Sequence, residues 1–195
     1  MSLSKPTDRQ RIHTRQIHCE GFQRHDGLWD IEASLVDTKS FTYSNHDRGD
    51  IPAGEPIHDM KIRITLDLEM QIHHVETCVS YTPFRICPNA AASMKRIEGL
   101  RVGSGWMREV RKLIPFTDSC THLIELLGPI STTAYQTMHR ALEEKAERLA
   151  QRQNQTGTGA STIRSIPPIL NQCHSLGSDT LVVKAIWPEF YTGKE

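Results

Sequence analysis

Trp29-Asp30-Ile31-Glu32-Ala33-Ser34-Leu35 alternates apolar and polar side chains without a break. Successive side chains of a β-strand point to opposite faces, so this stretch predicts a strand with one face in a core and the other in water. The turn-forming pair Asp26-Gly27 precedes it, and a further strand-like stretch begins near Arg11. We therefore expect an antiparallel hairpin over residues 11–39.

The same alternation returns over residues 60–68, where Ile62, Ile64 and Leu66 share one side. Glu69-Met70 then permits a tight reversal into another strand, over about 72–82. A polar loop rich in Gly, Pro and Asp is expected between the two hairpins, over residues 44–56.

The second half of the chain changes from strand to helix periodicity. Helices are predicted over residues 88–98, over 106–114 and from Cys120 onward. Pro129 is expected to kink or split the last of these helices, because proline lacks the donor N–H. Strands followed by helices predict an α+β fold, a twisted antiparallel sheet with two or three helices packed on one face.

Composition divides the chain into four expected parts. Residues 1–10 resemble a flexible leader, and residues 11–150 are expected to form a single α+β domain. Residues 151–165 are polar and rich in Gly and Thr, which is typical of a flexible linker. Residues 166–195 are expected to form a C-terminal arm with a strand over 181–186 that packs back on the domain.

Charge and cysteine content narrow the function classes. Lys and Arg number 23, as do Asp and Glu, so the formal net charge is zero and no basic field favours nucleic acid. No run reaches the ~20 apolar residues that a membrane span requires. The five cysteines are an odd number, without an export signal, which indicates reduced thiols and a cytoplasmic location.

The start of the long helix, Ser119-Cys120-Thr121-His122, combines a thiol with an imidazole. Asp118 or Ser119 is expected to cap this helix. A cysteine just after a cap lies at the positive end of the helix dipole, which favours the thiolate that binds metals and attacks electrophiles. The alternative is structural: a small packed cysteine and a histidine that caps or packs.

Further candidate ligands precede other predicted elements, Cys87 before a helix and His58-Asp59 before a strand. Because such positions can converge at one sheet edge, we expect His58, Cys87, Cys120 and His122 to form a site for zinc or iron. Alternatively, Cys120 acts as a nucleophile, with His58 as a base that Asp59 orients. Taken alone, Cys87 could be a packed thiol, and His58-Asp59 could be a turn.

Other histidines and cysteines are less indicative of a site. His73 and His74 are consecutive on a strand and point to opposite faces, so a shared metal is not expected. Cys19 and Cys78 are expected in the core. Cys173-His174 follows the linker, as part of a detached tail or of an arm that closes the pocket.

Nearly the whole chain resembles an uncharacterised bacterial family of unknown function, which implies a soluble bacterial protein. The resemblance is carried by these segments: Arg24 to Ala33 (RHDGLWDIEA), Asp37-Thr38-Lys39, Gly54 to Met60 (GEPIHDM), Cys87, Gly105-Trp106 and Cys120 to Leu126 (CTHLIEL).

Residues 54–140 also resemble the U-type iron–sulfur scaffold proteins in the order of their parts. The loop from Gly54, the cysteine before a helix (Cys87) and the cysteine that opens the long helix (Cys120) correspond to that family. The family's first cysteine has no counterpart, and His58 or Asp59 stands near its place. Three functions stay open: an enzyme acting on a small molecule, a metal or iron–sulfur carrier, and an interaction domain.

Overall fold

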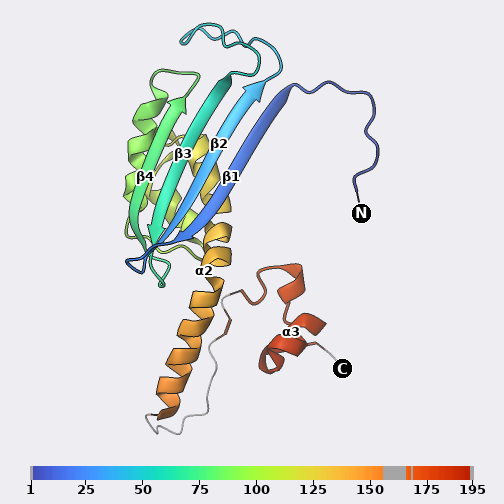
Figure 1. The fold of residues 1–195 in the computed structure, drawn as a ribbon, viewed down its shortest axis with the longest axis vertical. Helices are drawn as coiled ribbons and strands as arrows, with labels where there is room; N and C mark the ends of the chain where they lie inside the picture. The colour runs from blue at the N-terminus through green and yellow to red at the C-terminus, as the bar shows by residue number, and fades with distance from the viewer. Residues whose placement is uncertain (1, 156–165, 168, 194–195) are drawn as a thin grey trace. The chain divides into compact units, whose positions relative to one another are not determined.

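Four antiparallel strands form one sheet in the order in which they follow along the chain, β1-β2-β3-β4. The computed structural model describes residues 2–155, 166–167 and 169–193. The strands are β1 (His13–Gln23), β2 (Trp29–Lys39), β3 (Pro56–Leu66) and β4 (Ile72–Tyr81). Figure 1 shows them side by side, with the helices of the same part of the chain against one face of the sheet.

Both predicted hairpins are confirmed, and their turns follow from local chemistry. Gly27 has a φ of 88°, and Met70 has a φ of 63° in the reversal between β3 and β4. Asp26 Oδ1 accepts a hydrogen bond from the Leu28 N–H, and Asp67 Oδ1 accepts from two backbone N–H groups of its turn. Carboxylates that bind nearby backbone N–H groups are typical of such turns.

Helices follow the strands, as the change of period predicted. They are the 3₁₀ helix η1 (Cys87–Ile97), α1 (Trp106–Leu113), the short 3₁₀ helix η2 (Phe116–Asp118) and the long helix α2 (Thr121–Gln155). The predicted α+β class, with helices on an antiparallel sheet, is therefore confirmed.

Pro129 lies inside α2 and does not split it. Leu127 and Ile130, on either side of the proline, are both fully buried. Each fully buried side chain of this kind contributes about 1.5–3 kcal/mol, which is comparable to the roughly 3 kcal/mol that a proline costs inside a helix. Packing against the sheet thus holds the helix together across the missing hydrogen bond.

The core lies between the sheet and the helices. Alternate residues of β2 and β3 are buried, and their partners in the register lie on the same face: Trp29 with Leu66, Ile31 with Ile64, Ala33 with Ile62 and Leu35 with Met60. The helical side contributes residues at the spacing of one α2 face: Leu123, Leu127, Ile130, Ala134 and Met138.

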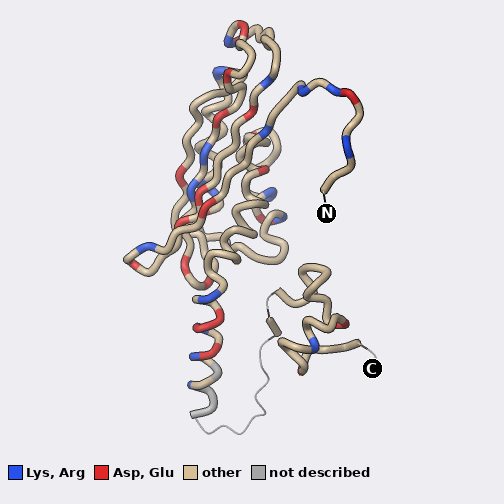
Figure 2. Tube along the Cα trace, turned by 45° about the vertical axis from the view of Figure 1, so that its right-hand side comes forward, with Lys and Arg blue, Asp and Glu red and all other residues tan. Residues whose placement is uncertain are grey.

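Charged residues of both signs are interspersed along the strands (Figure 2). On the face of the sheet away from the core, Arg63 donates to Glu32 and to Glu76 across neighbouring strands. Cys78 also lies in β4 but is exposed, so its expected place in the core is wrong, whereas Cys19 packs against the core. All five cysteines are free.

The chain divides into two compact units, Met1–Glu143 and Glu144–Glu195. In the second unit, the strand expected over 181–186 is wrong, because Leu181–Ile186 form helix α3. Thr180 caps that helix, with its Oγ1 accepting from the Val183 N–H. A side-chain cap satisfies free N–H groups locally, whereas a strand needs a partner strand.

Two further short 3₁₀ helices, η3 (His174–Leu176) and η4 (Pro188–Phe190), flank α3. The first residues of the expected linker, 151–155, belong to α2, and residues 156–165 lie outside the described part of the chain. Within the described ranges, no helix has both the length and the apolar content to cross a membrane.

Gly21 of β1 packs directly against Thr137 of α2. A Cβ added there would lie 1.9 Å from Thr137 Oγ1 and 2.6 Å from its Cγ2. Only glycine lets the strand and the helix meet at this distance.

Gly21→Ala should therefore destabilise the protein by about 1–3 kcal/mol, the usual cost of overpacking. Urea unfolding measures the difference. The double variant Gly21→Ala/Thr137→Ala should recover part of the loss, because it removes two of the three clashing atoms. An unchanged unfolding midpoint in Gly21→Ala would contradict this packing of β1 on α2.

Candidate functional site

A row of polar side chains crosses the core-facing side of the sheet where the apolar rows end. In the register, Arg15 of β1 pairs with Asp37 of β2, which pairs with His58 of β3. Asp37 is two residues beyond Leu35, and His58 is two residues before Met60, so both continue the buried phase of their strands. Strand alternation therefore directs a carboxylate and an imidazole inward at this edge.

Asp37 is the centre of this row and is only 1% exposed. Arg15 binds it through two hydrogen bonds, Nε to Oδ1 at 2.8 Å and Nη2 to Oδ2 at 2.7 Å. His13 Nε2 lies 3.2 Å from Oδ1. Burial opposes the charge of Asp37, but the hydrogen bonds and charge of Arg15 outweigh it and lower the pKa of this carboxyl group. Asp37 is therefore a buried, ionised carboxylate.

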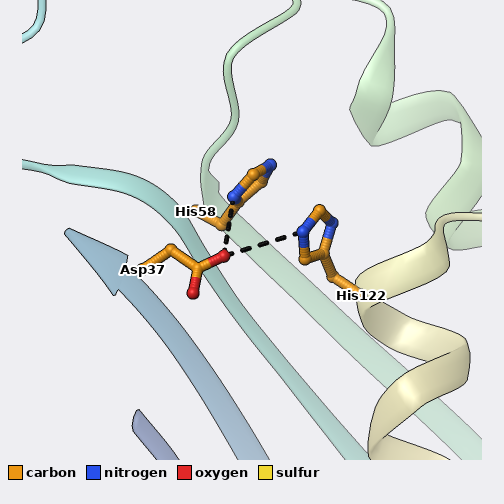
Figure 3. A group of neighbouring side chains, drawn as sticks. All are labelled: Asp37, His58 and His122. Atoms are coloured by element: carbon orange, nitrogen blue, oxygen red, sulfur yellow. Dashed lines mark hydrogen bonds and ion pairs between the residues drawn. The ribbon is translucent and has the colours of Figure 1, made fainter. Parts of the chain in front are cut away.

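Two imidazoles face this carboxylate from different elements (Figure 3). His58 Nδ1 lies 3.0 Å from Asp37 Oδ2, and His122 Nε2 lies 3.6 Å from the same oxygen. The rings stack with their centroids 3.7 Å apart and an interplanar angle of 32°. His58, near the start of β3, and His122, in the first turn of α2, therefore lie together, as the sequence analysis expected.

Both histidines favour the neutral form. Burial, with a smaller contribution from His122, lowers the pKa of His58 to about 4, although Asp37 opposes the shift. Burial and the charge of Arg15 lower the pKa of His122. Neutral imidazole has a lone pair for a metal ion or a proton, so this pair is ready for either role at neutral pH.

The first turn of α2 fixes the position of His122. Its first hydrogen bond runs from the Ile124 N–H to the Cys120 carbonyl. The expected caps are wrong: Asp118 binds Arg96, and Ser119 Oγ donates to the Phe116 carbonyl. The Ser119 hydroxyl thus closes η2 and the Asp118 carboxylate binds η1, so neither side chain accepts from the first N–H groups of α2.

Arg15 also connects α2 to the sheet. Its Nη1 donates to Glu125 Oε2 at 2.6 Å, while its other nitrogens bind Asp37. Glu125 lies one turn after His122 on α2. The same guanidinium group therefore holds the carboxylate of the site and the helix that carries the second histidine.

A pocket of about 690 Å³ opens beside the two histidines. Its lining includes the two histidines, both cysteines that the sequence analysis proposed as metal ligands, and one methionine: His58, His122, Cys87, Cys120 and Met60. Thr117, Asn89 and Arg96 are among its polar lining, and Pro83, Phe84 and Ile86 are among its apolar lining. The volume suits a small organic molecule.

The two cysteines of the pocket have different surroundings. Burial raises the pKa of the Cys87 thiol, which opposes thiolate formation there. Cys120 Sγ lies 3.5 Å from Met60 Sδ and 4.0 Å from His122 Nδ1. Cys120 therefore lies between two further atoms that bind soft metals.

Asp59 does not join this cluster. The carboxylate that contacts His58 is Asp37, and Asp59 follows His58 on the strand and thus belongs to the opposite face. Asp59 Oδ1 is buried and has no hydrogen-bond partner among the described residues. Cys173 and His174 belong to the second unit of the chain.

The sequence prediction omitted Asp37 and Arg15. For Asp37 a signal was present, because it continues the inward phase of Trp29, Ile31, Ala33 and Leu35. A carboxylate at such a position must find a partner in the fold. For Arg15 no comparable signal exists, because β1 is largely exposed and lacks a clear apolar alternation.

Asp37, His58 and His122 form a group with the geometry of metal ligands: one donor atom from each lies within 4.8 Å of the others. Two ligands about 2.1 Å from an ion lie about 3.0 Å apart at right angles and about 3.4 Å apart in a tetrahedron. The observed separations from Asp37 Oδ2, 3.0 and 3.6 Å, bracket these values.

The lowered pKa of His58 makes the stability of the metal-free protein depend on pH. Unfolded His58 binds a proton below its ordinary pKa of 6.5, whereas the folded residue resists protonation down to about 4. The unfolded state then binds more protons, so the free energy of unfolding should fall as the pH falls from about 6.5 to 4.

Urea unfolding in the presence of a chelator tests this. His58→Gln should flatten the pH dependence in this range. The control variant His25→Gln, which removes an exposed histidine from the turn between β1 and β2, should keep the wild-type slope. Equal slopes in all three proteins would show that His58 is not buried as described.

Comparison with known proteins identifies a family but no characterised relative. No curated protein and no solved structure matches the chain, so the resemblance to the U-type iron–sulfur scaffold proteins gains no support. The match that is found covers residues 13–136, which include all four strands, the three site residues and the first turns of α2. The chain belongs to the family described as "Protein of unknown function (DUF2889)".

Proposed function

We propose that this protein binds a divalent metal ion of the zinc or iron(II) class and uses it to act on a small molecule in the adjacent pocket. The ligands are Asp37, His58 and His122. The observation that carries the proposal is the convergence of two imidazoles with lowered pKa on one buried carboxylate. Two histidines and a carboxylate leave coordination positions for water or substrate, as in catalytic zinc and iron(II) sites.

The Asp37 carboxylate has an acceptor position available for a metal ion. A carboxylate has about four acceptor positions. Arg15 occupies two of them and His13 approaches a third, so one position on Oδ2 remains for His58 or a metal ion. Metal binding at His58 Nδ1 would displace the proton between His58 and Asp37, and by exchange with solvent the neutral ring would take up a proton on Nε2, so no net proton would be released.

The pocket supports a role beyond metal storage. A metal ion bound there lies beside a volume of about 690 Å³ that is lined by polar and apolar side chains. A bound ion would supply Lewis acidity to an oxygen of the small molecule. Asn89, Ser93 and Thr117 could orient such a molecule by hydrogen bonds, while Phe84 and Ile86 contact its apolar part.

A metal-free alternative is favoured by one contact, that between His58 Nδ1 and Asp37 Oδ2. A histidine that donates through Nδ1 has its Nε2 lone pair available as a general base. Cys120, on the same pocket, would then be the nucleophile. Metal binding by the purified protein distinguishes this alternative from the proposed function.

Protein purified without an affinity tag and stripped with a chelator should bind about one equivalent of Zn²⁺ in a calorimetric titration. His58→Ala and His122→Ala should each weaken binding by more than about 100-fold, because loss of a ligand exceeds the usual 10–100-fold cost of a supporting residue. The control is His73→Ala, which removes an exposed histidine that also contacts a carboxylate, that of Asp67.

Circular dichroism must show that the two variants remain folded, and His122→Gln supplies a larger replacement if the alanine variant unfolds. Equal Zn²⁺ affinity in the wild type, His58→Ala and His122→Ala would overturn the metal site. Absence of binding in the wild type, combined with alkylation of Cys120 that depends on His58, would favour the metal-free alternative.

A further inference from the structure

The two ring nitrogens of His122 face different potential metal ligands. Its Nε2 faces Asp37, and its Nδ1 lies 4.0 Å from Cys120 Sγ. Cys120 Sγ in turn lies 3.5 Å from Met60 Sδ. The residues come from two elements, because Met60 belongs to β3 and the other two lie at the start of α2.

We propose that Cys120, Met60 and His122 Nδ1 form a second metal position, selective for a soft monovalent ion such as Cu(I). Thiolate and thioether sulfur bind Cu(I) in preference to hard ions, and imidazole is also a ligand of copper. The position is distinct from that of the divalent ion in its donors, although the two share the His122 ring. Binding of Cu(I) at this position does not depend on binding of a divalent ion by Asp37, His58 and His122.

The distances fit a three-coordinate ion. Donors at about 2.0–2.3 Å from an ion, separated by angles of about 120°, lie about 3.7–4.0 Å from one another. Cys120 Sγ lies 3.5 Å from Met60 Sδ and 4.0 Å from His122 Nδ1. Binding would therefore move the two sulfur atoms apart by about 0.5 Å and bring Cys120 Sγ about 0.3 Å closer to His122 Nδ1.

The three donors are also accessible to an ion. Met60 is only 1% exposed, yet it lines the pocket together with Cys120 and His122. The Met60 side chain thus belongs both to the pocket lining and to the apolar core. A soft ion loses little solvation energy in such a place, in contrast with a small hard ion that retains its water.

The negative charge of Asp37, whose Oδ2 lies 3.6 Å from His122 Nε2, favours the tautomer of His122 with its proton on Nε2. Neutral histidine has its proton on one nitrogen and a lone pair on the other. With the proton on Nε2, directed toward the Asp37 carboxylate, Nδ1 has the lone pair that faces Cys120.

Binding is a simple exchange of an ion for a proton. Cu(I) forms bonds to Cys120 Sγ, Met60 Sδ and His122 Nδ1, the S–H bond of Cys120 breaks, and the proton passes to the buffer. No electron is transferred. Because a neutral imidazole offers a single lone pair, the Cu(I) form of His122 cannot bind a divalent ion through Nε2. The two ions should therefore compete.

The experiment is an anaerobic titration of the full chain with Cu(I), in competition with a chromophoric Cu(I) chelator and under reducing conditions. The wild type should bind about one equivalent of Cu(I). Cys120→Ser should weaken binding by more than about 100-fold, and Met60→Leu, which preserves side-chain volume, should weaken it about 10-fold. The matched control is Cys78→Ser, since Cys78 is an exposed thiol on the opposite face of the sheet.

Parallel Zn²⁺ titrations separate this proposal from the proposed function. Cys120→Ser should retain Zn²⁺ binding, whereas His58→Ala should lose Zn²⁺ but retain Cu(I) within a few-fold, because His58 is not a ligand of the soft ion. Saturating Zn²⁺ should raise the apparent dissociation constant of Cu(I). Circular dichroism checks the fold of each variant, and Cys120→Ala replaces the serine variant if that variant unfolds.

Unchanged Cu(I) affinity in Cys120→Ser would overturn the soft site, as would an equal loss in Cys78→Ser. Loss of Cu(I) binding in Cys120→Ser but not in Met60→Leu would remove the thioether from the ligand set and contradict the proposal in this form. If the wild type binds Cu(I) but not Zn²⁺, the soft site is retained and the proposed divalent site is wrong.

Discussion

The buried carboxylate of Asp37 is the interaction on which the site depends. A charge at 1% exposure is stable only when other groups replace the water that it has lost, and Arg15 does so with two hydrogen bonds. Once the charge is compensated, the carboxylate positions His58 through a contact of 3.0 Å and faces His122. Both imidazoles of the cluster therefore face this one buried group.

The same charge network connects the site with the packing of the fold. Arg15 binds Glu125 on α2 as well as Asp37 on β2, so the helix cannot shift along the sheet without breaking a short ion pair. At the other end of the contact, Gly21 permits β1 to approach Thr137 of α2. The helix that brings Cys120 and His122 is thereby fixed at two places along β1.

The donors expected from the sequence lie together in the structure, and residues that the sequence analysis did not include lie beside them. His58, Cys87, Cys120 and His122, which the sequence analysis expected to converge, all line one pocket. The carboxylate was assigned to Asp59, the neighbour of His58 in sequence, but on a strand the neighbour in sequence points to the other face. Asp37 lies across from His58 in the register instead.

The sequence by itself determined the two hairpins, the inward and outward faces of β2 and β3, and the helical face that covers them, because these follow from local periodicity and turn chemistry. The tertiary structure decided which strand lies beside which, and thus that Arg15, Asp37 and His58 form one row. It also decided that Pro129 stays inside a helix and that Leu181–Ile186 are helical rather than extended. Such outcomes depend on packing energies and on partners distant in the chain, and a local pattern of side chains contains no information about either.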